Sequence, residues 1–83
     1  MGVLEFLPSF ESEINYRNAL LDILNENKQF DYAELNRDSF KERINWWNQY
    51  TTHENLIVKH IAKYWLRLIR KEIYLKTQLK SRL

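Results

Sequence analysis

Cysteine is absent from this chain of 83 residues, and glycine and proline occur once each, at Gly2 and Pro8. The absence of cysteine excludes disulfide bonds, thiolate metal sites and a cysteine nucleophile. Because the single glycine stands at position 2, the chain has no glycine-rich loop that can hold phosphate groups. No strong turn signal follows Pro8, and the sequence therefore favours a few helices over many short strands.

The sequence also lacks a long hydrophobic run. No stretch approaches the roughly 18 apolar residues that a membrane-spanning helix needs. Residues 1–8 have apolar character but lack the basic segment of a signal peptide. With 45% apolar residues, the chain is expected to fold as one domain, residues 1–83, with residues 1–8 as a short apolar N-terminal arm. We expect an intracellular, cytoplasmic location.

Apolar residues recur with the period of a helix, and the sequence predicts an all-α fold, a small bundle. The predicted main helices are residues 9–27, 39–50 and 52–78, with a short helical turn at residues 31–36. Three capping boxes indicate helix starts: Asp31 with Glu34, Ser39 with Glu42, and Thr51 with Glu54. In the absence of a suitable glycine, Asn25 and Asn27 are the residues available to end the first helix in a left-handed conformation.

The predicted core joins the apolar faces of the three main helices. Its expected members are Leu21, Leu24, Ile44, Trp47, Ile61, Trp65 and Leu68. The apolar arc of the last helix is about 200° wide, roughly twice the arc that one packed face requires. We therefore predict that apolar surface remains for a partner, and the interface candidates are Trp46, Tyr50 and Glu72.

Charge is divided unevenly along the chain. Residues 1–53 carry five Lys and Arg against nine Asp and Glu, whereas residues 54–83 carry eight against two. The last helix is predicted to present a basic ridge, which consists of Lys59, Lys63, Arg67, Arg70 and Lys71, with Tyr74 beside it. Such a ridge suits the phosphates of a nucleic acid or an acidic protein, or it is a solvated face partly paired with the acidic half of the chain. A membrane surface is disfavoured because the bundle needs the same apolar arc for its core.

Glu72 projects near the middle of the apolar arc of the last helix. A buried carboxylate costs several kcal/mol unless it is paired. Two interpretations follow: packing is loose at this turn and Glu72 reaches water, or Glu72 meets an Arg or Lys across an oligomer interface.

The sequence predicts no catalytic residue, no metal site, no cofactor and no small-molecule substrate. His53 and His60 share a helical face, but Ile57 stands where the zinc pattern His-Glu-x-x-His requires its second histidine.

We therefore predict a small non-catalytic interaction protein: a regulator, an inhibitor or an accessory subunit. It would bind a protein partner or its own copy through an apolar-aromatic surface and the basic helix. The alternative is a small nucleic-acid-binding protein that uses the basic C-terminal helix.

Overall fold

A computed structural model describes residues 9–37 and 39–82, with side-chain detail through residue 78; the predicted arm at residues 1–8 lies outside the described residues. The helices are α1 (Phe10–Ile23), α2 (Tyr32–Arg37), α3 (Phe40–Asn48) and α4 (Leu56–Arg82), and the described residues contain no strand. The predicted all-α fold is confirmed.

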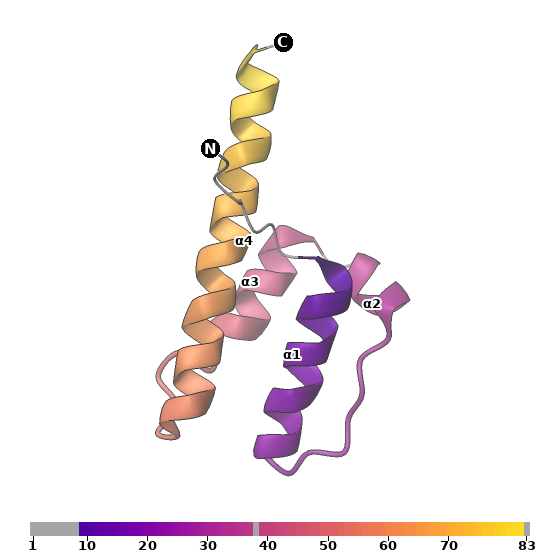
Figure 1. The fold of residues 1–83 in the computed structure, drawn as a ribbon, viewed down its shortest axis with the longest axis vertical. Helices are drawn as coiled ribbons and strands as arrows, with labels where there is room; N and C mark the ends of the chain where they lie inside the picture. Colours follow the sequence, from indigo (N-terminus) through magenta and orange to yellow (C-terminus); the bar gives the residue numbers. More distant parts are fainter. Residues whose placement is uncertain (1–8, 38, 83) are drawn as a thin grey trace, which may run out of the picture.

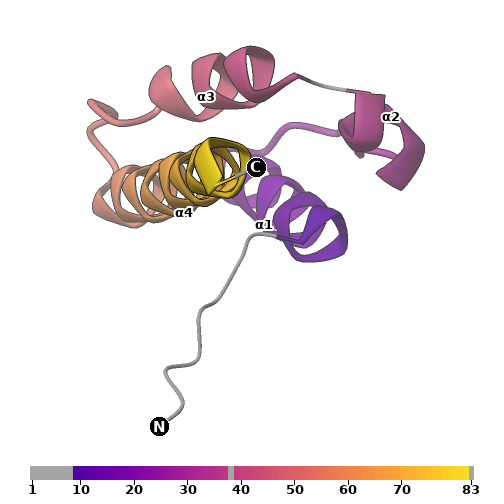
Figure 2. The same ribbon diagram turned by 90° about the horizontal axis from the view of Figure 1, so that it is seen from above.

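The longest helix, α4, is the axis of the fold. Its 27 residues extend about 40 Å at 1.5 Å per residue, and its C-terminal part continues beyond α1 and α3 (Figure 1). Seen from above, α1 and α4 lie side by side, α3 covers one side of them, and α2 lies beyond the end of α3 (Figure 2). No other described helix covers the opposite side of the α1–α4 pair.

Local hydrogen bonds explain where most helices begin and end. The Ser9 hydroxyl accepts from the Ser12 amide at 3.2 Å, and the Ser39 hydroxyl accepts from the Glu42 amide at 3.2 Å, so the predicted Ser39 cap is confirmed. Asn25 has a φ of 62°. It is the predicted left-handed residue after α1, although α1 ends at Ile23 and is therefore shorter than expected.

The predicted start of the last helix at residue 52 is wrong. The helix α4 begins at Leu56, where the Asn55 side-chain oxygen accepts from the amides of Ile57 at 2.9 Å and Val58 at 3.3 Å. The Thr51 hydroxyl instead donates to the Asn48 carbonyl at 2.9 Å. Thr51 and Asn55 are both good capping residues, and Thr51 is used to close the end of α3.

The core consists of two clusters of buried side chains. The cluster between α1, α3 and α4 contains Leu20, Trp47, Val58, Ala62, Trp65, Leu66 and Ile69. The cluster beneath α2 contains Ile14, Leu21, Phe30 and Leu35. Of the predicted core residues, Trp47 and Trp65 lie in the first cluster and Leu21 in the second.

The other predicted core residues, Leu24, Ile44, Ile61 and Leu68, are only partly buried at the edge of the first cluster. The buried face of α4 therefore includes Ala62 and Leu66, which the prediction omitted. Helical periodicity gives the width of an apolar arc, but the packing of α1 and α3 decides which part of that arc is covered.

Candidate interaction surface

The helix α4 carries two apolar stripes, and only one of them is fully used by the core. Val58, Ala62, Trp65 and Ile69 form the stripe that α1 and α3 bury. Ile57, Ile61, Tyr64 and Leu68 form a second stripe, turned by about 100° from the first because each member precedes its buried counterpart by one residue. Ile57 is 59% exposed and Tyr64 is 39% exposed.

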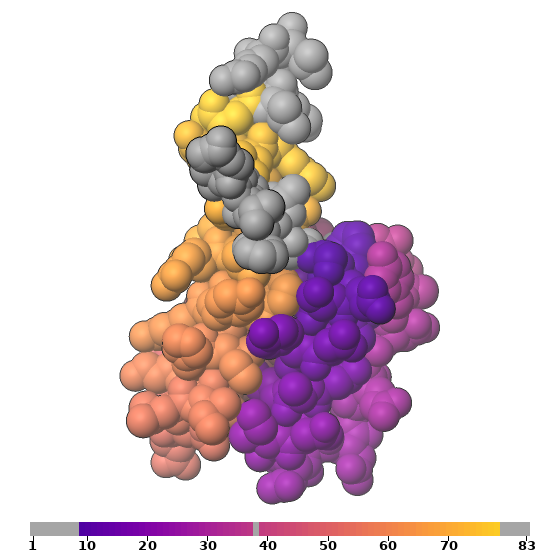
Figure 3. All heavy atoms as spheres, in the orientation of Figure 1, coloured from indigo at the N-terminus to yellow at the C-terminus, as the bar shows by residue number. Residues whose placement is uncertain are grey.

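Tyr16 of α1 extends the exposed stripe across to the neighbouring helix. Its ring stacks on the ring of Tyr64, with centroids 5.7 Å apart, and it is itself 40% exposed. We call the residues of this surface the apolar strip: Tyr16 and Ile23 of α1, and Ile57, Ile61, Tyr64 and Leu68 of α4. Figure 3 shows α1 and α4 side by side on this face of the molecule.

A shallow depression of about 220 Å³ lies within the apolar strip. It is lined by Tyr16, His60, Ile61 and Tyr64. A depression bordered by aromatic rings offers a place where an apolar side chain of a partner can insert.

The exposed cations of the basic ridge lie next to the end of α3. Lys63, Arg67 and Arg70 are exposed, whereas Lys59 and Lys71 are half-buried; Tyr74, at 61%, is well exposed. Lys63, Arg67 and Arg70 line one groove of about 410 Å³ together with Asn48, Thr51 and Leu66. Among the described residues, no carboxylate forms an ion pair with these three cations. Their charge is therefore available to an external anion.

The outer edge of α1, beside the apolar strip, is acidic. Glu11 and Asp22 of α1 are exposed, and they project roughly 120–140° around the helix from Tyr16 at 100° per residue. This direction leads away from α4. The acidic edge of α1 therefore adjoins the apolar strip, whereas Lys63 and Arg70 lie on the side of α4 that faces the end of α3.

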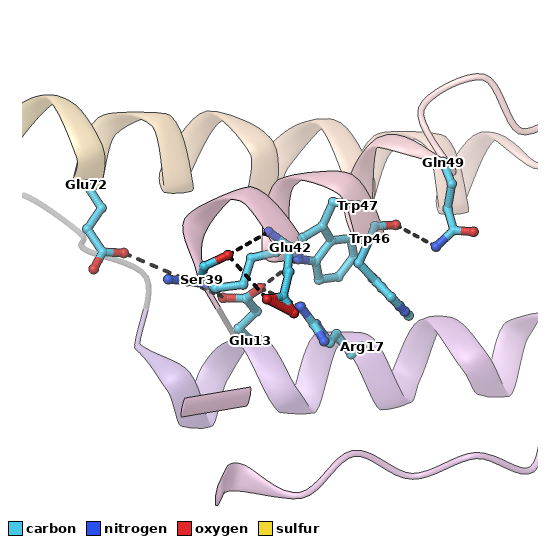
Figure 4. Close-up of polar contacts among 9 residues, drawn as sticks. Glu13, Arg17, Ser39, Glu42, Trp46, Trp47, Gln49 and Glu72 are labelled. Carbon is cyan, nitrogen blue, oxygen red and sulfur yellow. Dashed lines mark hydrogen bonds and ion pairs between the residues drawn. The ribbon is translucent and has the colours of Figure 1, made fainter. Parts of the chain in front are cut away.

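A buried ionic network joins α1 and α3 behind this face. Glu13 is fully buried, and its carboxylate accepts from Arg43 Nε at 3.0 Å, from Arg43 Nη2 at 2.6 Å and from Trp47 Nε1 at 2.8 Å. Arg17 Nη2 lies 3.5 Å from Glu13 Oε2, the oxygen that accepts from Trp47. Figure 4 shows Glu13 rising from α1 toward Trp47 on α3.

Aromatic rings line the two buried guanidinium groups. Arg17 lies 4.7 Å from the ring centroid of Trp46 and 5.1 Å from that of Phe30. Arg43 lies 5.3 Å from the centroid of Phe10 and 5.4 Å from that of Phe40. Such contacts stabilise a cation that is shielded from water. The ionic network therefore has a structural role, because its hydrogen bonds join α1 to α3.

Glu72 is part of this ionic network, and its side chain is largely shielded from solvent. Its side chain is 13% exposed, and its oxygens lie 3.6 Å from Arg43 Nη2 and 3.5 Å from Lys76 Nζ. The expectation that Glu72 reaches water through loose packing is wrong, because the cations that compensate it come from α3 and from the next turn of α4.

The two aromatic interface candidates are half-buried. The ring of Trp46 contacts those of Phe30, Trp47 and Tyr50, with centroids 5.3, 4.9 and 5.1 Å away. Burial, with a smaller effect from the negative charge of Glu26, raises the pKa of the Tyr50 phenol above its usual value near 10. Tyr50 is therefore neutral at physiological pH and packs as part of this aromatic cluster.

Sequence reasoning missed the network that Glu13, Arg17 and Arg43 form. A signal was present, because Glu13 and Arg17 are four residues apart and both project onto the apolar arc of the first helix. Charged residues at such positions need partners from another helix. The described residues contain no group of three or more His, Asp or Glu that can hold a metal ion.

Comparison with protein family models, with curated proteins and with solved structures found no match. Across the described residues, no helix combines the length and the hydropathy that crossing a membrane requires. A functional assignment therefore depends on the residues of the chain itself.

Proposed function

We propose that this chain is a small non-catalytic interaction protein that binds a helix of a protein partner on the apolar strip. The observation that carries the proposal is the second apolar stripe of α4, in which Ile57 and Tyr64 are exposed and Ile61 and Leu68 are only partly buried. A stable bundle of this size does not need Ile57 or Tyr64 at its surface, since a separate stripe of α4 already supplies the core.

The spacing of the strip suits a helical partner. Ile57, Ile61, Tyr64 and Leu68 follow each other at intervals of four, three and four residues, the spacing that lets one helix pack along another. The basic ridge on the same helix adds a preference for an acidic partner, because complementary charge speeds association and disfavours basic partners.

Photo-cross-linking tests this proposal in the cells that make the protein. With p-benzoylphenylalanine in place of Tyr64, we expect covalent capture of a protein chain, identified by mass spectrometry. The matched control replaces Tyr32, which is 51% exposed on α2 and lies outside the strip. Equal capture from both positions, or capture from neither, would contradict the proposal.

A second candidate function, nucleic-acid binding, is favoured by the groove of Lys63, Arg67 and Arg70. Three cations without intramolecular ion pairs can follow a phosphate backbone, with an affinity that falls as salt rises. If this function holds, the protein co-elutes with a duplex oligonucleotide on size-exclusion chromatography at low salt. A variant with Lys63→Gln and Arg70→Gln should then lose co-elution, whereas one with Lys28→Gln and Lys41→Gln should keep it. Absence of co-elution at low salt removes this candidate.

A further inference from the structure

We infer that the basic ridge of α4 binds a single-stranded nucleic acid, with a base stacked on the ring of Tyr74. This site lies on a different face of α4 from the apolar strip and so goes beyond the proposed protein partner. It also gives the nucleic-acid candidate its class of ligand. The described residues supply both parts of a sequence-independent single-strand site, a positively charged groove and an exposed aromatic ring.

The groove beside the end of α3 is the cationic part of the site. Lys63, Arg67 and Arg70 line about 410 Å³ together with Asn48 and Thr51. The three cations are exposed, and no described carboxylate forms an ion pair with them. From Lys63 to Arg70 the row extends about 10 Å along the helix, so it can contact more than one phosphate of a strand.

The ridge carries no negative charge of its own. Glu72 is the single acidic residue in the sequence of α4, and at 100° per residue it projects roughly 140–160° away from Arg67 and Tyr74. Its oxygens lie instead near Arg43 of α3 and Lys76. A strand that follows the ridge therefore meets no repulsion from a carboxylate of α4.

Tyr74 lies in line with the three cations of the groove. At 100° per residue, its side chain projects within about 40° of each of them, and it stands one turn, about 6 Å, beyond Arg70. Its side chain is 61% exposed. Among the described residues, no aromatic ring packs against it. The ring is therefore accessible to a base of a strand whose phosphates contact the groove.

The exposed ring favours a single strand over other anionic partners. The bases of a duplex are paired and stacked on each other, so they cannot lie on Tyr74 unless they first leave the stack. The bases of a single strand can stack on an aromatic side chain directly. A duplex or an acidic protein segment would contact the cations only. We therefore expect a single strand to bind more tightly than the duplex of the same sequence.

Fluorescence anisotropy of the purified full chain tests the inference, with a labelled single strand of mixed sequence and with the duplex of that sequence. At low salt we expect a dissociation constant on the order of 10 µM for the single strand. Tyr74→Ala should weaken single-strand binding about tenfold and leave duplex binding unchanged, whereas Tyr74→Phe should bind like the parent chain. The control Tyr32→Ala, which removes an exposed tyrosine on α2, should change neither.

The salt dependence of single-strand binding tests the cations. Three phosphate contacts predict a slope of about −2 for the logarithm of the association constant against the logarithm of the salt concentration. Lys63→Gln combined with Arg70→Gln should reduce the slope to about −0.7. Lys28→Gln combined with Lys41→Gln, which removes two exposed cations outside the ridge, should leave it unchanged. Circular dichroism of each variant shows whether the fold is kept.

Three outcomes would overturn the inference: no single-strand binding at low salt, an equal loss of single-strand and duplex binding in Tyr74→Ala, or competition by polyglutamate as strong as that by unlabelled strand. The last would assign the ridge to an acidic protein. Cross-linking from position 64 tests the proposed protein partner separately. Capture of a protein without single-strand binding keeps the proposed function and rejects only this inference, and single-strand binding without capture does the reverse.

Discussion

Replacement of Glu13 by alanine is expected to lower the free energy of unfolding by about 3–5 kcal/mol, the cost of removing one partner from a buried ion pair. Glu13 holds Arg43 by two hydrogen bonds and Trp47 by one, and all three side chains are almost fully buried. Once the carboxylate is removed, Arg43 and Trp47 lose the acceptor of these three hydrogen bonds. For a domain of this size, with a total stability of roughly 4–12 kcal/mol, this loss brings the chain close to unfolding.

Urea denaturation followed by tryptophan fluorescence measures the effect of Glu13→Ala. The control is Glu11→Ala, an exposed carboxylate in the first turn of the same helix, which should cost less than about 1 kcal/mol. Glu13→Gln keeps the side-chain volume but removes the charge, and its loss should lie between the other two. Similar losses for Glu13→Ala and Glu11→Ala would show that the ionic network does not hold α1 to α3.

The second large effect is expected from Ile69→Ala, with Ile57→Ala as a control on the same helix. Ile69 is fully buried, whereas Ile57 is 59% exposed. Removal of a buried isoleucine side chain to alanine costs about 2–5 kcal/mol, because apolar surface loses its packing and a cavity remains. Ile57→Ala should change the free energy of unfolding of the monomer by about 0.5 kcal/mol or less.

This comparison uses one substitution at two positions of one helix, so differences in helix propensity cancel. The measurement is made at low micromolar protein concentration, where association contributes little to stability. Equal losses at the two positions would mean that the two stripes of α4 are wrongly assigned.

The helices were predictable because their signals are local. The Ser39 cap and the left-handed Asn25 depend on neighbouring residues only, and both were identified from the sequence. The start of α4 was not, because Thr51 and Asn55 are both suitable caps and the choice depends on how α3 ends.

The surface was predictable in part. The width of the apolar arc on the last helix indicated surplus apolar surface, and the structure has Ile57 and Tyr64 exposed. Which half of the arc is buried depends on the positions of α1 and α3, and periodicity along one helix does not contain that information. The pairing of Glu13 with Arg43 joins residues 30 positions apart, and such a distance in sequence leaves no local signal.

The measurement that tests the central claim most directly is photo-cross-linking from position 64, with position 32 as the control, in the cells that make the protein. The claim is that the apolar strip binds a protein partner. It predicts covalent capture of a protein chain from position 64 and not from position 32. Equal capture from both positions, or capture from neither, would contradict it.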